Sequence, residues 1–131
     1  MKIATPFLTI FFLMTSFSVY SQNASSLPGV WKGTSICQQK NSPCHDEIAV
    51  YHISKTAKAN IFEINGNKLV NNKEEEMGIL YYTYDAAKQT MVSVDEAHGN
   101  RCEFKINGTS MEGTLMSKGE LYRIIKLKKD N

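Results

Sequence analysis

The sequence predicts an all-β protein, a single antiparallel up-and-down (meander) β-barrel of about eight strands. Short segments rich in Val, Ile, Tyr, Phe and Thr recur about every ten residues, whereas helical periodicity is nearly absent. The connections are short and rich in Asn, Gly, Asp and Lys, which leaves no room for crossover helices. A meander has two exposed edges, and closing it into a barrel removes them.

The N-terminal segment has the pattern of an export signal. Residues 1–21 carry one cation, Lys2, then an apolar run, and end in the small residue Ser21. This arrangement is typical of a secretory signal peptide that is cleaved between Ser21 and Gln22, with Asn23 as the alternative first residue of the mature chain. We therefore expect residues 1–21 to be a signal peptide and residues 22–131 to be one secreted or periplasmic barrel domain, with no membrane span after cleavage.

The remaining chain is a succession of strand-like segments. We expect about eight or nine strands, at residues 30–37, 47–55, 60–65, 68–71, 77–84, 89–95, 101–107, 110–116 and 120–128. The Asn-Gly pairs at 65–66 and 107–108 predict tight hairpin turns, because these residues tolerate positive φ. The polar run at 72–76 indicates a solvated loop.

Alternation assigns faces to two of these strands. Cys102, Phe104 and Ile106 form an apolar row, and the opposite face of their strand is charged. On the last strand, Arg123 lies within an apolar row. A guanidinium in such a row needs carbonyl groups to donate to and a surface to stack on. Because the first and last strands of a barrel are neighbours, we expect Arg123 to stack on Trp31.

The motif Gly29-Val30-Trp31 at the head of the first strand, together with Arg123 on the last, resembles the signature of the calycin superfamily of lipocalin-like barrels. The resemblance implies that Gly29, Trp31 and Arg123 close one end of the barrel and have a structural role. The stretch 29–53 and the chain from residue 74 onward, nearly the whole mature chain, also look like a family of small exported bacterial proteins of unassigned function. That second resemblance implies no activity.

Three cysteines, Cys37, Cys44 and Cys102, would enter an oxidising compartment, where a disulfide is the default for two of them. We expect Cys37 to pair with Cys44, because turn-forming residues separate them in a short loop. Cys102 would then be a buried thiol. Pairing of Cys102 with Cys37 or with Cys44 stays open, since it requires only a neighbouring strand with suitable spacing.

The same region offers zinc ligands in Cys37, Cys44 and His45, with Cys102 or His98 as a fourth. Their spacing lacks the paired motifs of structural zinc sites, so we expect neither a metal nor a cofactor. The sequence shows no G-x-S-x-G motif or phosphate-binding loop, and we expect no enzyme. Lys and Arg total 15 against 13 Asp and Glu, a net charge of +2, which predicts no nucleic-acid partner.

These expectations together indicate a non-catalytic binding protein. We expect a monomeric barrel that holds a small hydrophobic ligand; the alternative is a protein-binding module, such as an inhibitor of an extracellular enzyme. A completely filled interior is an equally open interpretation, because side chains fill many small barrels. The candidate residues for a ligand-binding barrel lining are His52, Phe62, Tyr82, Tyr84, Phe104 and Met111.

Overall fold

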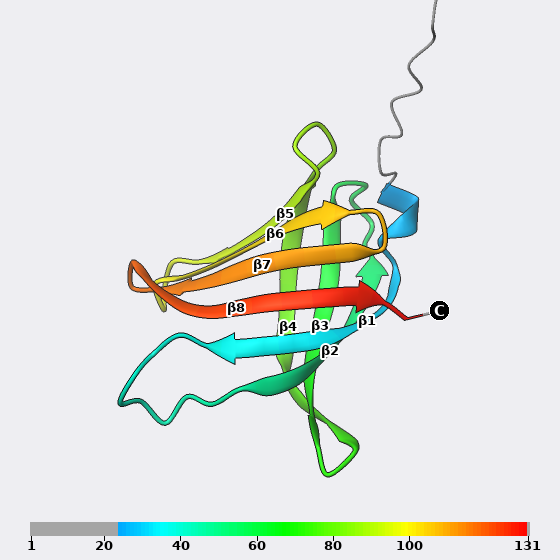
Figure 1. Ribbon diagram of the computed structural model, residues 1–131. Helices are drawn as coiled ribbons and strands as arrows, with labels where there is room; N and C mark the ends of the chain where they lie inside the picture. Colours follow the sequence, from blue (N-terminus) through cyan, green and yellow to red (C-terminus); the bar gives the residue numbers. More distant parts are fainter. Residues whose placement is uncertain (1–23, 131) are drawn as a thin grey trace, which may run out of the picture.

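The computed structural model describes residues 24–130, and the predicted signal peptide lies outside them. Eight antiparallel strands form one closed barrel, in which each strand pairs with the next and β1 pairs with β8 (Figure 1). The predicted up-and-down barrel is therefore confirmed. The strands are β1 (Gly29–Cys37), β2 (Glu47–Lys55), β3 (Ile61–Val70), β4 (Lys73–Asp85), β5 (Thr90–Asp95), β6 (Asn100–Asn107), β7 (Ser110–Ser117) and β8 (Glu120–Lys129). Within the described chain, no helix has the length and apolar character needed to cross a membrane.

Two predicted boundaries are wrong, and both concern the β3–β4 hairpin. The segments 60–65 and 68–71 form the single strand β3, and its ladder with β4 shifts register between Gly66 and Asn67. The Asn-Gly pair therefore lies at a bulge rather than at a turn. β4 begins at Lys73, so most of the predicted loop is strand. Asn71 and Asn72 make the turn, at φ of 52° and 63°, and the hairpin projects beyond the barrel (Figure 1).

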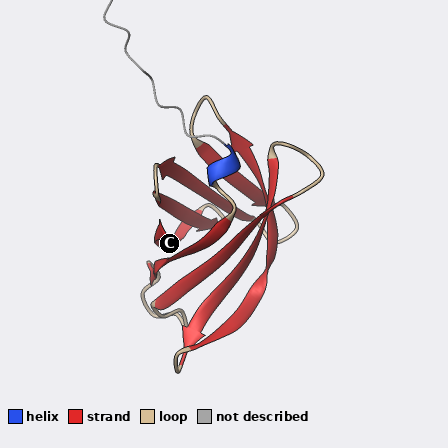
Figure 2. Ribbon diagram, turned by 90° about the vertical axis from the view of Figure 1, so that its right-hand side faces the viewer, coloured by secondary structure: helices blue, strands red, loops and turns tan. Residues whose placement is uncertain are grey.

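One end of the barrel is closed by the short 3-10 turn η1 (Ala24–Ser26) and the residue that follows it (Figure 2). Leu27 and Trp31 are fully buried, and the Trp31 Nε1–H donates to the Leu27 carbonyl at 2.9 Å. The Lys129 ammonium lies 6.0 Å from the centre of the Trp31 ring and donates to the Ser26 carbonyl. These contacts join the start of β1 to the end of β8.

The predicted contact between Trp31 and Arg123 is wrong, because Arg123 lies towards the other end of the barrel. In the ladder between β1 and β8, Trp31 pairs with Lys129 and Cys37 pairs with Arg123. These two positions on β1 are six residues apart, about 20 Å at roughly 3.3 Å per residue. The last strand continues past Arg123 to Lys129, which supplies the cation beside Trp31. Gly29 does belong to this closed end, since a Cβ there would lie 3.0 Å from the Lys129 Cε.

Towards the closed end, side chains fill the barrel interior. Phe62 and Tyr84 pack edge to face with ring centres 6.1 Å apart, and the rings of Tyr82 and Phe104 are 5.8 Å apart. Such aromatic pairs add stability beyond the area that they bury. The other buried members of this core are Leu27, Trp31, Ala49, Tyr51, Ile53, Ile64, Met91, Cys102, Ile106, Met111, Ile125 and Leu127.

At the opposite, open end, β4 separates from β5. The two strands pair through Thr83, Tyr84 and Asp85, whereas β3 pairs with β4 along its whole length. From Lys73 to Tyr82, β4 therefore has a described strand partner on one side only. Four large apolar side chains of this segment, those of Met77, Ile79, Leu80 and Tyr81, are 46–58% exposed, whereas Tyr82 is buried. The barrel wall is consequently open beside this edge of β4.

Candidate functional site

A pocket of about 270 Å³ occupies the open half of the barrel interior. Its walls come from inward-facing residues of β1, β2, β3, β7 and β8 and from the separated part of β4. The lining residues are Ser35, Glu47, Tyr51, Ile64, Gly66, Met77, Gly78, Ile79, Leu80, Tyr82, Leu115, Arg123 and Ile125. Most of these side chains are apolar, so the pocket suits an apolar ligand.

The space exists because two facing residues of its wall have no side chains. Gly66 on β3 pairs with Gly78 on β4. A Cβ at Gly66 would lie 3.4 Å from the Tyr51 ring, and a Cβ at Gly78 would meet nothing within 4 Å. Since β5 does not cover this part of β4, no neighbouring strand supplies side chains to fill the gap. The pocket therefore exists because Gly66 and Gly78 have no side chains and because β5 does not pair with this part of β4.

A cluster of paired charges lies on the pocket wall. The Arg123 Nη1 donates to the Ser35 carbonyl at 3.2 Å, to the Ser35 hydroxyl at 3.3 Å and to the His45 carbonyl at 3.0 Å. The Arg123 Nη2 lies 3.5 Å from the Glu47 Oε1, and that oxygen lies 3.8 Å from the Lys68 ammonium. The side chains of Arg123 and Glu47 are only 11% and 12% exposed. Their pairing is what makes burial of both charges tolerable.

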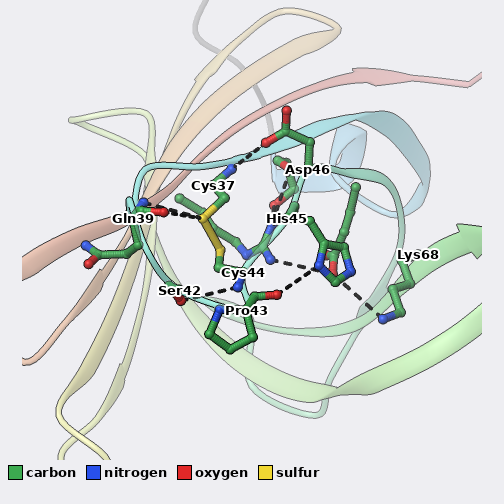
Figure 3. A network of polar contacts seen from close by, with 11 residues as sticks. Cys37, Gln39, Ser42, Pro43, Cys44, His45, Asp46 and Lys68 are labelled. Atoms are coloured by element: carbon green, nitrogen blue, oxygen red, sulfur yellow. Dashed lines mark hydrogen bonds and ion pairs between the residues drawn. A yellow bond between two sulfur atoms is a disulfide. The ribbon is translucent and has the colours of Figure 1, made fainter.

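A disulfide loop (Figure 3) lies next to this cluster, since its His45 carbonyl accepts a hydrogen bond from Arg123. Cys37 and Cys44 are joined, with Cα atoms 5.9 Å apart, which confirms the predicted pairing. The Cys37 amide donates to the Asp46 Oδ1 at 2.9 Å, so the loop is also tied at its base. Cys102 is a buried free thiol, as predicted. A disulfide in so small a domain indicates an oxidising environment, extracellular or periplasmic.

The buried thiol and the two buried phenols of the interior stay protonated at neutral pH. Burial raises the pKa of the Cys102 thiol to about 11, against a smaller, opposite effect of its hydrogen bond with Tyr82. Burial likewise raises the pKa of the Tyr51 and Tyr82 phenols. Since the thiolate is the reactive form of cysteine, Cys102 is a poor nucleophile. Among the described residues, no three His, Cys, Asp or Glu side chains are grouped to hold a metal ion.

The structure places the six predicted lining residues in three environments: the pocket wall, the packed core and the outer surface of the barrel. Tyr82 lines the pocket. Phe62, Tyr84, Phe104 and Met111 are buried in the packed core and do not line it. The interior is thus partly filled and partly hollow.

The prediction that His52 lines the barrel interior is wrong, because His52 lies on the outer surface of the barrel. Ala49, Tyr51 and Ile53 are the inward row of β2, and His52 alternates with them. Its Nε2 contacts the Glu74 Oε1 at 2.7 Å, and this hydrogen bond lowers the pKa of Glu74. His52 therefore does not contact a ligand in the barrel.

Sequence reasoning missed the polar residues of the pocket wall, Ser35 and Glu47. Glu47 shares the inward row of β2 with Ala49, Tyr51 and Ile53. A carboxylate in an apolar row is the same signal that singled out Arg123, and the two side chains prove to be partners. The alternation of inward and outward residues along β2 could therefore have identified Glu47 from the sequence.

No family model matches this chain, and no curated protein matches it either.

Proposed function

We propose that this chain is an exported, non-catalytic, lipocalin-like β-barrel that binds a small neutral hydrophobic ligand at its open end. The observation that carries the proposal is the apolar pocket of about 270 Å³ beside the separated part of β4. This volume is slightly below the range of about 300 to 1,000 Å³ for pockets of drug-sized ligands. The ligand is accordingly a small molecule.

The charged groups of the wall favour a neutral ligand over an anionic one. Arg123 already donates to the Ser35 and His45 carbonyls, and Glu47 balances its charge. An anionic head group would have to displace these partners, and the Glu47 carboxylate would repel it. An apolar body, in contrast, gains from contact with Ile64, Leu80, Leu115 and Ile125.

Two further features support an exported protein without catalysis. The disulfide between Cys37 and Cys44 suits a compartment outside the cytoplasm, in agreement with the predicted signal peptide. The buried phenols and the Cys102 thiol are protonated, and the carboxylate of Glu47 is paired. The pocket therefore presents no activated nucleophile or free base.

The test combines ligand identification with a matched pair of variants. Exported protein is extracted with organic solvent for mass spectrometry, and a hydrophobic dye is titrated into the stripped protein. Leu80→Trp, which fills the pocket, should weaken dye binding about tenfold or more. Tyr81→Trp is the control, because Tyr81 is the next residue of the same exposed strand and does not line the pocket. Absence of any extracted ligand and of saturable dye binding would contradict the proposal.

A second candidate function, binding of an extracellular protein, is favoured by the exposed edge of β4. An extended segment of a partner could add a strand along Met77–Tyr81, where backbone groups face no described strand and apolar side chains are exposed. A pull-down from the envelope fraction tests it. Ile79→Lys on this edge should abolish capture, whereas Val94→Lys, at a similarly exposed apolar residue of β5, should not. Equal capture by both variants would remove this candidate.

A further inference from the structure

A second hollow lies on the outside of the barrel, away from the interior pocket. It is a groove of about 760 Å³ that crosses β1, β8, β7 and β6 and reaches the β4–β5 turn. Figure 1 shows β8 between β7 and β1. The lining residues are Lys32, Gly33, Thr34, Lys88, Gln89, Lys105, Ile106, Asn107, Ser110, Met111, Glu112, Lys126, Leu127 and Lys128.

The groove concentrates positive charge. Its lining holds five lysines and one glutamate, a formal excess of four positive charges, although the whole chain carries only +2. Lys32 is paired with Asp130 at 3.2 Å and Lys126 with Glu112 at 3.8 Å. The other three lysines, Lys88, Lys105 and Lys128, have no carboxylate of the described chain within ion-pair distance. The ammonium groups of these three lysines therefore remain available to bind an external anion.

The strand register brings these cations together on one face. Lys32 on β1 pairs directly with Lys128 on β8, and both are exposed. Lys126 lies two residues along β8, on the same face. Lys105 on β6 pairs with Glu112 on β7, which in turn pairs with Lys126. Like charges directly opposite each other in a sheet are destabilising, and a bound anion would relieve that repulsion.

We propose that this groove binds an oligoanion, a molecule that carries several phosphate or sulfate groups. The lysines span four neighbouring strands, about 15 Å at roughly 4.8 Å per strand, so one small anion cannot contact all of them. Lysine binds such groups as a point charge, with its alkyl chain lying along the groove. No aromatic side chain lines the groove, so it offers no platform on which nucleic-acid bases could stack.

The proposal is tested by calorimetric titration of inorganic tripolyphosphate into the full exported protein at low ionic strength. Saturable binding with one site per chain is expected, and it should weaken at higher ionic strength because salt screens exposed charges. The double variant Lys105→Gln with Lys128→Gln should weaken binding about tenfold or more. The double variant Lys40→Gln with Lys55→Gln removes equal charge from exposed sites outside the groove and should bind as the parent does.

Further titrations test which class of anion the groove binds and whether it is independent of the interior pocket. Binding of a sulfated oligosaccharide that depends on Lys105 and Lys128 would show that the groove accepts sulfate esters as well as phosphates. The pocket variant Leu80→Trp should leave tripolyphosphate binding unchanged, which separates this site from the interior pocket. No saturable binding of tripolyphosphate, or equal weakening by both double variants, would overturn the proposal. Preferential binding of a single-stranded oligonucleotide of matched charge would overturn it too, because bases would then contribute.

Discussion

Arg123 joins the last strand to three groups of the segment 35–47, which is distant from it in sequence. Its guanidinium donates to β1 at Ser35 and to the disulfide loop at His45, and it pairs with Glu47 on β2. The planar, five-donor guanidinium suits this task better than an ammonium group would. The sequence predicted that a buried Arg123 would need carbonyl partners, and the structure supplies them. The expected stacking partner was wrong, because the ring beside Arg123 is that of Tyr122.

We predict that Arg123→Ala destabilises the fold by roughly 1 to 3 kcal/mol, because it removes hydrogen bonds to the Ser35 and His45 carbonyls. Urea unfolding of the variant and the parent measures this difference. Lys126→Ala is the matched control, since Lys126 lies on the same strand but is exposed, and it should change the free energy of unfolding by less than about 0.5 kcal/mol. Equal stability of Arg123→Ala and the parent would contradict the structural role of Arg123.

The buried thiol of Cys102 predicts a loss of stability at alkaline pH. Its pKa rises from 9.0 to about 11 on burial, so the unfolded chain releases this proton before the folded chain does. The contribution to stability is complete below pH 9.0 and is lost as pH rises to about 11. It amounts to roughly 3 kcal/mol at most. Cys102→Ala should therefore show a weaker decline in the free energy of unfolding over this range, and an identical decline would contradict the prediction.

The disulfide loop between β1 and β2 is the element that contacts the Arg123 guanidinium through the His45 carbonyl. Joining Cys37 to Cys44 constrains the unfolded chain, by roughly 2.5 kcal/mol on the chain-entropy estimate for a loop of this length. We predict that Cys37→Ala with Cys44→Ala lowers the free energy of unfolding by about that amount. Urea unfolding measures it, with Cys102→Ala in the parent so that no free thiol can exchange. A stability that does not change would mean that the hydrogen bond from Cys37 to Asp46 is sufficient to hold the loop.

Strand existence was predictable along the chain, but strand boundaries at the β3–β4 hairpin were not. Alternation with a period of two marks half-buried strands well, as at Cys102, Phe104 and Ile106. The Asn-Gly pair at 65–66 misled because a bulge and a turn both favour residues that tolerate positive φ. The partner of Trp31 was missed because it depends on the register between β1 and β8, which alternation does not determine.

The candidate site was less predictable than the fold, since a pocket is made by the absence of contacts. The aromatic residues expected to line a cavity form most of the packed core instead, and only Tyr82 lies in the pocket wall. The pocket depends on Gly66 facing Gly78 and on the early separation of β4 from β5. Neither feature leaves a pattern in the sequence. The calycin resemblance stays a prediction, because unrelated proteins share barrel topologies.

At the scale of the whole molecule, the barrel should be unevenly protected from solvent. We predict fast hydrogen exchange for those amides of Met77–Tyr82 that point away from β3, because they have no partner strand. Amides in the β7–β8 ladder should exchange slowly, since each of these strands has a partner on both sides. Hydrogen exchange followed by mass spectrometry compares the two regions. Similar exchange rates would show that β4 and β5 are joined in solution.

The separated edge of β4 also makes the protein vulnerable to self-assembly. An exposed strand edge with apolar side chains is a template on which another chain can pair, and growth along it leads to fibrils. Charged residues placed on an edge oppose such pairing by mutual repulsion. Glu74, Glu75 and Glu76 lie immediately before Met77 on this edge, and all are exposed. They are positioned to oppose pairing of this edge with another chain.

This opposition to pairing can be measured as a rate of aggregation. Glu75→Gln with Glu76→Gln removes two negative charges beside the edge and leaves the contact between His52 and Glu74 intact. Light scattering at concentrations where the parent stays clear should then rise with time. Glu96→Gln with Glu120→Gln removes the same charge from exposed residues outside β4 and should leave the solution clear. The acidic run Glu74–Glu76, predicted from the sequence as a solvated loop, would then determine the highest concentration at which this open-walled barrel stays in solution without polymerising.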